Sequence, residues 1–247
     1  MRVGIISDIH SNVEALRAVL QEFEDRHVEK IICLGDIIGL GSRPDECIAL
    51  LQENSDKILC AVRGNHENYL LKELPVHNHG DKTKAKLPKE ILDLVRWNHR
   101  QIVESSLNYL KKLPEYAIVE VEGTKIFVSH YPKENDAYRQ FYYKPNLKES
   151  EEIFAGYDAD VYLYGHTHIR NLQQSKSGKL YINPGSVGCP IGTDSASAGI
   201  LDIEKDKITY EQLDIVYDIE TVIDDMLQHS SEVPAIDYTV RRFYRED

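Results

Sequence analysis

The sequence predicts an α/β fold with two sheets, and two observations carry this prediction. Over the first 62 residues, apolar runs of strand length alternate with helical patterns, which is typical of a right-handed, parallel βαβαβ progression. Farther along, short alternating runs separated by turn residues predict strands that pair antiparallel. We therefore expect one domain over residues 1–247, with two mixed sheets and a helical insertion.

A third observation concerns the point at which the apolar runs end. Five runs lead directly into segments that contain Asp, Asn or His: 3–6, 30–34, 58–62, 126–129 and 161–164. Open α/β sheets place their chemistry at the carboxyl edge of their strands. We therefore expect the polar side chains after these runs to form one site.

The first three strands are expected at residues 2–7, 30–34 and 57–62. Ser11 or Asn12 can cap the helix that follows the first strand, and Pro44 can open the helix that follows the second. Two glycines, Gly39 and Gly41, keep the loop after the second strand free of side chains.

A helical insertion is expected over residues 69–112, packed beside the strand edge. The apolar residues of 88–112 recur at helical spacing and predict one long amphipathic helix. The insertion also contains His77, His79 and His99, for which a solvated loop is a simpler interpretation than a third metal site.

The second half of the chain begins with a hairpin formed by 119–121 and 125–128 around Glu122-Gly123. The elements expected after it are a loop at 131–147 that overhangs the site, a helix at 148–155, a strand at 161–164, antiparallel strands at 179–182, 197–203 and 207–213, and a helical tail at 217–247.

Composition limits the classes of function. The formal net charge of −12 argues against a surface built for the nucleic-acid backbone, although bound cations can still attract an anionic substrate locally. No apolar run approaches the ~20 residues that a membrane span needs. The first strand starts at residue 2, and we therefore expect no signal peptide and a cytoplasmic location. The cysteines (Cys33, Cys47, Cys60 and Cys189) form no CxxC pair and are expected to be buried free thiols.

Seven residues at strand ends carry oxygen or imidazole donors: Asp8, His10, Asp36, Asn65, His130, His166 and His168. Each alone could be an ordinary capped or solvated polar group. As a set, this mixture of carboxylate, amide and imidazole suits Mn, Fe, Zn or Ni better than Ca. Two such ions held ~3.5–4 Å apart can clamp the attacking and leaving oxygens of a phosphoryl displacement, with Asp36 as the natural bridge.

At this point the chain resembles the calcineurin-like metallophosphoesterases. Their five motifs are similar to Asp8-x-His10, Gly35-Asp36, Gly64-Asn65-His66-Glu67, His130 and Gly165-His166-x-His168, in that order. Asn183-Pro184-Gly185-Ser186 further resembles the small bacterial and archaeal phosphodiesterase branch, whose fold is a four-layer β-sandwich flanked by helices. The family's usual Gly-His is Ser129-His130 here, a change that removes no ligand.

The resemblance implies a role for each position. Asp8, His10 and His168 would bind one divalent metal and share Asp36 with a second, which Asn65, His130 and His166 would complete. A hydroxide bridging the ions would attack phosphorus. His66 would protonate the leaving oxygen or stabilise the transition state. Some members of the branch carry Cys at this position, so His66 leaves monoester hydrolysis chemically open.

Substrate contacts are expected from Arg63 and from the loop at 131–147. Within that loop Lys133, Tyr138, Arg139 and Lys144 can hold a phosphate and stack a base. An ordinary surface loop with aromatic anchors explains the same residues equally well. Arg63 can reach the phosphate or pair with a carboxylate.

The expected function is hydrolysis of phosphodiesters or phosphoanhydrides of small nucleotides, such as dinucleoside polyphosphates, with two divalent metals, Mn first among them. One alternative is a serine/threonine protein phosphatase of the same superfamily. Another is a binding scaffold similar to the retromer subunit that shares this fold with an incomplete ligand set. Apolar residues of the tail could instead mark a surface for homo-oligomers: Ile236, Tyr238, Val240, Phe243 and Tyr244.

Overall fold

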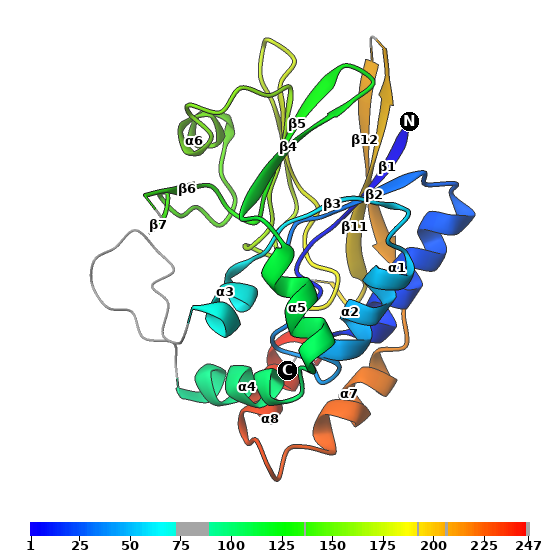
Figure 1. The fold of residues 1–247 in the computed structure, drawn as a ribbon, viewed down its shortest axis with the longest axis vertical. Coiled ribbons are helices and arrows are strands. Elements are labelled where there is room, and N and C mark those ends of the chain that lie inside the picture. Colours follow the sequence, from blue (N-terminus) through cyan, green and yellow to red (C-terminus); the bar gives the residue numbers. More distant parts are fainter. Residues whose placement is uncertain (73–88, 136, 192, 206, 246–247) are drawn as a thin grey trace.

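Two mixed five-stranded sheets pack face to face in the computed structural model, which describes residues 1–72, 89–135, 137–191, 193–205 and 207–245. Helix α6 (Leu147–Ile153) lies on one flank of the strands, and α1 (Val13–Asp25) and α2 (Pro44–Glu53) lie on the other (Figure 1). The layers are therefore helix, sheet, sheet and helix, which confirms the predicted α/β class.

The first sheet combines the amino-terminal βαβαβ unit with two later strands. Its members are β1 (Arg2–Ile6), β2 (Lys30–Cys33), β3 (Ile58–Ala61), β11 (Ala196–Glu204) and β12 (Lys207–Ile215). The order is β12-β11-β1-β2-β3. β1, β2 and β3 run parallel, whereas β11 is antiparallel to both of its neighbours. The carboxyl ends of the three parallel strands therefore share one edge.

The second sheet has the order β4-β5-β8-β10-β9. Its members are β4 (Tyr116–Val121), β5 (Thr124–Ser129), β8 (Val161–Leu163), β9 (Asn171–Gln174) and β10 (Leu180–Asn183). The prediction that the strand at 179–182 is purely antiparallel was wrong. β10 lies parallel to β8 and antiparallel only to β9, a strand that the sequence pattern did not predict. Three of the four residues of β9 are polar, so the strand gives little apolar signal.

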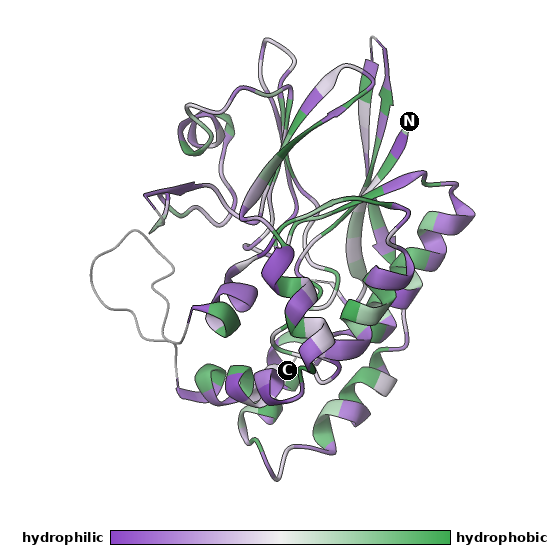
Figure 2. Ribbon diagram, viewed as in Figure 1, coloured by the Kyte–Doolittle hydropathy of each residue, from purple (hydrophilic) through white to green (hydrophobic). Residues whose placement is uncertain are grey.

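The core between the sheets is made by side chains that strands of both sheets point inward. Ile5 and Ile32 of the first sheet pack in one cluster with Val128, Leu163 and Ile182 of the second. Figure 2 shows β2 and β3 as predominantly hydrophobic, and β12 and the outer helices as mixed. Full burial of each such side chain is worth roughly 1.5–3 kcal/mol, so this layer fixes the position of one sheet against the other.

The remaining described elements are α3 (Asn65–Leu71), α4 (Lys89–Arg100), α5 (Glu104–Lys112), α7 (Ile219–Leu227), α8 (Ala235–Phe243) and the short hairpin β6 (Lys133–Glu134) with β7 (Ala137–Tyr138). None of the described helices is both long and apolar enough to cross a membrane. Asn12 caps α1 by accepting from the Ala15 main-chain N–H at 3.0 Å, one of the two caps predicted.

The single long helix predicted over 88–112 is two helices in the structure. α4 ends at Arg100, and α5 starts at Glu104. The Val103 N–H between them donates to the Asp45 carboxylate at 3.2 Å, a tertiary contact that replaces an intrahelical bond. Helical periodicity alone does not reveal such a break. His77 and His79 lie outside the described residues.

The tail forms two helices, of which α8 packs against α4 and α7 packs against α8 and α1. Ile236, Val240 and Tyr244 are buried in one cluster with Trp97 of α4, and Tyr238 is exposed. The expectation that these apolar residues form an exposed surface was therefore wrong for three of the five. α4, α7 and α8 lie beyond the end of the sheets at which the strands run into the polar motifs (Figure 1).

Candidate metal centre

The seven strand-end residues predicted from the sequence converge at one place between the sheets. Asp8 and His10 follow β1, Asp36 follows β2, and Asn65 begins the helix after β3. His130 follows β5, and His166 and His168 follow β8. Because the carboxyl ends of these strands meet, residues far apart in sequence come within hydrogen-bond distance. We call the set the strand-end cluster: Asp8, His10, Asp36, Asn65, His130, His166 and His168.

One half of the strand-end cluster forms around Asp8. His168 Nε2 lies 2.9 Å from His10 Nε2 and 3.3 Å from Asp8 Oδ1. The second Asp8 oxygen, Oδ2, accepts from Ser7 Oγ at 2.5 Å and from the His166 main-chain N–H at 3.1 Å. Asp8 Oδ1, by contrast, is buried with no hydrogen-bond partner among the described residues.

The other half forms around Asp36. His130 Nε2 lies 3.2 Å from Asp36 Oδ2 and 3.0 Å from Asn65 Oδ1. Three groups of donor atoms, each within 4.8 Å, are Asp8-His10-His168, Asp36-His130-His166 and His10-Asp36-His66. Asp36 and His10 each belong to two groups, so the groups overlap.

The tautomers of two rings show that the strand-end cluster suits a cation. His130 Nδ1 lies 2.9 Å from the Leu34 carbonyl, and His168 Nδ1 lies 2.8 Å from the Cys189 carbonyl. A carbonyl only accepts, so each Nδ1 carries the hydrogen and each Nε2 presents a lone pair. These lone pairs face carboxylate and amide oxygens. Such a collection of acceptors fits divalent metals with imidazole and oxygen ligands.

Without a cation, the same crowding drives protons onto the rings. Burial opposes a charge on His130, yet the negative charges of Asp36 and Asp8 prevail and raise its pKa to about 9. The pKa of His168 is also raised, since Asp8 outweighs the effect of burial. Burial instead lowers the pKa of His10 well below its usual value. Metal and protons therefore compete for the same atoms.

The backbone at the strand-end cluster is unusual. Nine described non-glycine residues have positive φ, and six of them are Asp8, His10, Ser11, Asp36, His166 and His168. The left-handed region costs an ordinary residue of order 1 kcal/mol, so it persists only where the surroundings enforce it. Concentration of this strain at one place marks a functional site.

Residues 1–206 match the family described as the calcineurin-like phosphoesterase superfamily domain. The chain belongs to this superfamily. It is therefore a phosphoester hydrolase of a metal-dependent family, and the resemblance drawn from the five motifs is confirmed. The match spans the whole strand-end cluster.

Comparison with individual proteins extends this likeness over almost the full chain. The uncharacterized protein MJ0912 of Methanocaldococcus jannaschii is 32% identical over 249 residues, covering 92% of each chain. Phosphodiesterase MJ0936 of the same organism is 26% identical, over 83% of this chain and 95% of its own length. A metallophosphoesterase structure from Sphaerobacter thermophilus, 27% identical, superposes with a TM-score of 0.72 over 97% of this chain and 99% of its own.

Glu67 positions the phosphoesterase site, a role that its membership of a motif did not predict. Its carboxylate accepts from the main-chain N–H groups of Gly64, Asp36, Ile37 and Ile38 at 2.6–3.2 Å. It thereby ties the loop of Asp36 to the start of α3. It lies three residues after Gly64, in the place that Glu occupies in a capping box, although glycine has no side chain to complete the box.

Asn98 of α4 is a second support that no local pattern reveals. Its side chain is fully buried, donates to Ser11 Oγ and the Gly41 carbonyl at 2.9 Å, and accepts from the Gly39 N–H at 3.1 Å. A Cβ on Gly39 would collide with the His66 ring, so this position must carry no side chain, as predicted. Helix α4 therefore supports the loop of Gly39 and Gly41, which lies against the His66 ring.

A third support is the segment that contains the Asn-Pro-Gly-Ser motif. Asn183 donates to the Gly165 carbonyl at 2.8 Å, and Ser186 Oγ donates to the Asp8 carbonyl at 2.7 Å. The Cys189 carbonyl then fixes the His168 ring. This motif orients strand-end residues through the main chain rather than through chemistry of its own.

Beside the strand-end cluster, three cations surround one carboxylate. Arg63, Lys72 and Lys133 place nitrogen atoms 3.7, 2.6 and 3.1 Å from Glu115. We call these four residues the cationic rim: Arg63, Lys72, Glu115 and Lys133. Lys133 Nζ also lies 5.1 Å from the centre of the Tyr138 ring, which is 5.0 Å from the His166 ring. The cationic rim therefore adjoins the strand-end cluster. Arg63 pairs with a carboxylate, which is one of the two alternatives that the sequence left open.

The other predicted substrate contacts lie differently. Arg139 donates to the carbonyls of Ile153 and Ala155 at 3.1 and 2.6 Å, so its guanidinium anchors the β6–β7 hairpin to the end of α6. Lys144 is exposed. His99 is partly buried near His66, and burial lowers its pKa to about 4.

Proposed function

We propose that this phosphoesterase is a phosphodiesterase or pyrophosphohydrolase that cleaves small nucleotides, such as dinucleoside polyphosphates. The observation that carries the proposal is the pair of donor groups Asp8-His10-His168 and Asp36-His130-His166, which lie next to a cluster of cations. Phosphodiesterase MJ0936 supports the diester part of the proposal.

Two divalent metals, Mn first among them, would be held by the strand-end cluster. Asp8, His10 and His168 would hold one ion, Asn65, His130 and His166 the other, and Asp36 would bridge them. When bound, the pair supplies a hydroxide nucleophile near neutral pH and offsets charge on the phosphoryl oxygens. Fe, Zn or Ni also suit this donor set.

His66 acts next to this pair as a hydrogen-bond donor to the leaving oxygen. Its ring packs 4.8 Å from that of His10, and its Nδ1 is buried without a hydrogen-bond partner among the described residues. Burial lowers the pKa of His66 against the pull of the Asp36 charge, so the ring is neutral at pH 7. A neutral imidazole stabilises developing negative charge by hydrogen bonding rather than as a full cation.

The cationic rim binds the part of the substrate that does not react. Three cations and one carboxylate leave a local charge of about +2 in a chain whose formal net charge is −12. A second phosphate of an anhydride can compete with Glu115 for Lys133 and Arg63. This arrangement favours polyphosphates and diesters over an uncharged ester.

The experiment that tests the proposal is Mn²⁺-supported hydrolysis of a panel: p-nitrophenyl phosphate, its bis-ester, cyclic nucleotides, dinucleoside polyphosphates and phosphopeptides. We expect the highest kcat/KM on dinucleoside polyphosphates or diesters, and we expect Asp36→Ala to abolish both turnover and metal content. Asp158→Ala, an exposed carboxylate, is the control. Turnover of phosphopeptides alone would support a protein phosphatase, and silence across the panel with little bound metal would support a scaffold.

A further inference from the structure

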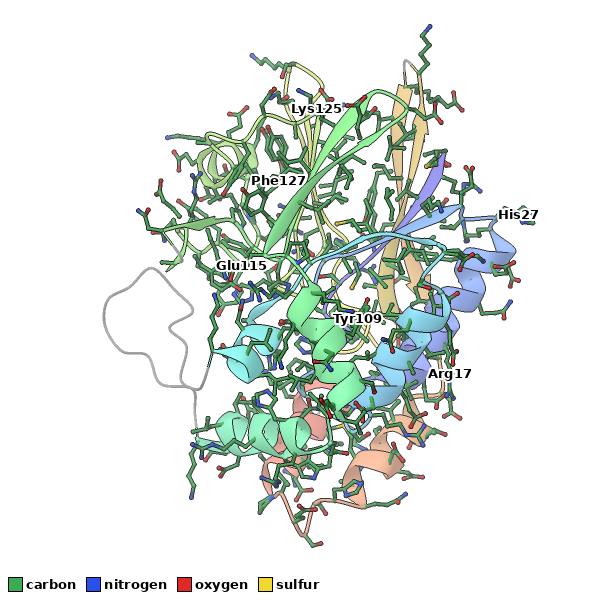
Figure 3. All side chains as sticks on the ribbon, viewed as in Figure 1. Arg17, His27, Tyr109, Glu115, Lys125 and Phe127 are labelled. Carbon is green, nitrogen blue, oxygen red and sulfur yellow. The ribbon has the colours of Figure 1, made fainter. Side chains whose placement is uncertain are left out.

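A pocket of about 550 Å³ opens on the outer face of the β4–β5 strand pair, beside the cationic rim. Its volume lies in the ~300–1,000 Å³ range of small-molecule sites. We call it the aromatic pocket, and its lining residues include Glu115, Tyr116, Phe127, Ser129, Lys133 and Tyr157. In Figure 3, Glu115 lies near the start of β4 and Phe127 farther along the strand pair.

Strand register places the aromatic pocket next to the site. Tyr116 pairs with Ser129 and Ile118 pairs with Phe127, so these four side chains share one face. Ser129 directly precedes His130, whose ring points the opposite way, into the strand-end cluster. The Tyr131 ring, which also lines the pocket, lies 5.6 Å from the His166 ring. The pocket and the strand-end cluster therefore lie on opposite faces of the same strand end.

Three rings build one wall of the pocket. Phe127 and Tyr157 have ring centres 4.1 Å apart, and Tyr116 stacks 5.7 Å from Phe127 with planes 25° apart. The Tyr157 hydroxyl donates to the Lys133 carbonyl at 3.0 Å, which fixes this wall against the hairpin of the rim. Tyr116 remains 54% exposed although it is a large aromatic residue. An aromatic surface left open in this way suits a planar ligand.

Polar groups supply the remaining features of a ligand site. Ser129 is 2% exposed, and its Oγ has no hydrogen-bond partner among the residues that the structure describes. Lys133 stands at the rim end with Glu115. One end of the pocket is therefore cationic, its wall is aromatic, and its floor has an unused hydroxyl.

We infer that the aromatic pocket binds the nucleobase of the nucleotide that is not the leaving group, while Arg63 and Lys133 bind oxygens of the phosphate attached to that nucleotide. Ser129 Oγ then hydrogen-bonds an edge of the base, and Tyr116 stacks on its face. This inference rests on the proposed function, because it assigns the part of that substrate that lies beyond the reacting phosphate.

The test compares two esters with the same leaving group, thymidine 5′-(p-nitrophenyl phosphate) and methyl p-nitrophenyl phosphate, in the presence of Mn²⁺. We expect wild-type protein to prefer the thymidine ester in kcat/KM. Tyr116→Ala lowers that preference roughly five- to tenfold through loss of stacking, and Tyr116→Phe retains it. The matched control is Ile118→Ala, because Ile118 lies on the same face of β4, is 53% exposed and does not line the pocket.

Titration calorimetry with thymidine separates this inference from the proposed function, because binding needs no turnover. Weaker thymidine binding by Tyr116→Ala than by Ile118→Ala supports the pocket even if neither ester is cleaved, in which case only the proposed function fails. Turnover of both esters with a preference that Tyr116→Ala leaves unchanged, and with unchanged thymidine binding, overturns the pocket and leaves the phosphodiesterase intact.

Discussion

The strand-end cluster and the cationic rim lie side by side, yet main-chain geometry holds the first and ion pairs between side chains hold the second. Asp8, Asp36, His130 and His168 are each fixed by main-chain partners or by positive φ. The rim depends on contacts of Glu115 with three flexible cations. We therefore expect substitutions at the cluster to abolish chemistry and substitutions at the rim to tune substrate binding.

The largest effect that sharpens this comparison is expected at His66, one of whose ring nitrogens lies within 4.8 Å of possible ligand atoms of His10 and Asp36. If His66 acts on the leaving oxygen, His66→Gln should lower kcat for bis-p-nitrophenyl phosphate by about 100-fold or more while KM changes little. Metal content measured by mass spectrometry should stay at the wild-type level.

His99→Gln, which alters a neighbouring histidine of α4, is the control and should keep full kcat. Loss of metal in His66→Gln would show that His66 is a ligand. It would then belong to the part of the site that only holds ions.

The strand-end cluster was predictable from sequence for a physical reason. A buried strand that ends in Asp or His delivers that side chain to a known edge, so Asp8, Asp36 and His130 needed no tertiary information. The roles of Glu115 and Asn98, by contrast, could not be predicted without tertiary information. Glu115 meets cations from three separate segments, and Asn98 reaches the site from a helix whose own pattern shows only amphipathicity.

The same reasoning explains the errors in the fold. The break between α4 and α5 depends on Asp45, and the antiparallel neighbour of β10 is a strand with little apolar signal. Local pattern shows what a segment prefers by itself. It does not show which distant partner receives its hydrogen bonds.

The second effect concerns support of the strand-end cluster by Glu67. Each Glu67 oxygen accepts from two main-chain N–H groups. Glu67→Gln must therefore turn an NH₂ toward two donors, whichever way the amide lies. We expect a loss of ~1–3 kcal/mol in the free energy of unfolding, measured by urea denaturation, and metal affinity reduced by about 10- to 100-fold.

Glu149 offers a matched control, because it closes a capping box at the start of α6 in a partly exposed position. Glu149→Gln should change metal affinity little. Equal metal affinity in both variants would mean that the Asp36 loop holds its shape without Glu67, and that main-chain support is weaker than we describe.

The third effect is smaller and concerns the cationic rim, where we expect a substitution to improve substrate binding instead of weakening function. Burial opposes ionisation of Glu115, but the Lys72 hydrogen bond and the Lys133 charge hold its pKa below the usual value. The carboxylate is therefore charged at pH 7 and neutralises part of the rim. Glu115→Gln should lower KM for a dinucleoside polyphosphate a few-fold at low ionic strength, and salt should remove the gain.

Glu122→Gln, at the tip of the β4–β5 hairpin, removes the same charge outside the rim and should leave KM unchanged. A higher KM in Glu115→Gln would indicate that the carboxylate orients the cations instead of masking them. The rim would then resemble the strand-end cluster in being preorganised.

The smallest effect tests whether positive φ is costly in this chain at all. His27 follows the end of α1, has φ of 56°, is exposed, and lies at the edge of the molecule away from the cluster (Figure 3). Glycine adopts this conformation without strain, so His27→Gly should raise the free energy of unfolding by ~1 kcal/mol and Tm by roughly 2–4 °C, with kcat unchanged. Calorimetry would measure both.

An unchanged Tm would mean that positive φ is tolerated without cost here, and the six strained residues at the cluster could no longer be taken as a sign of function. A rise in Tm at His27 would show that the chain accepts at Asp8, His10 and Asp36 a cost that glycine would remove, because only their side chains can form the site.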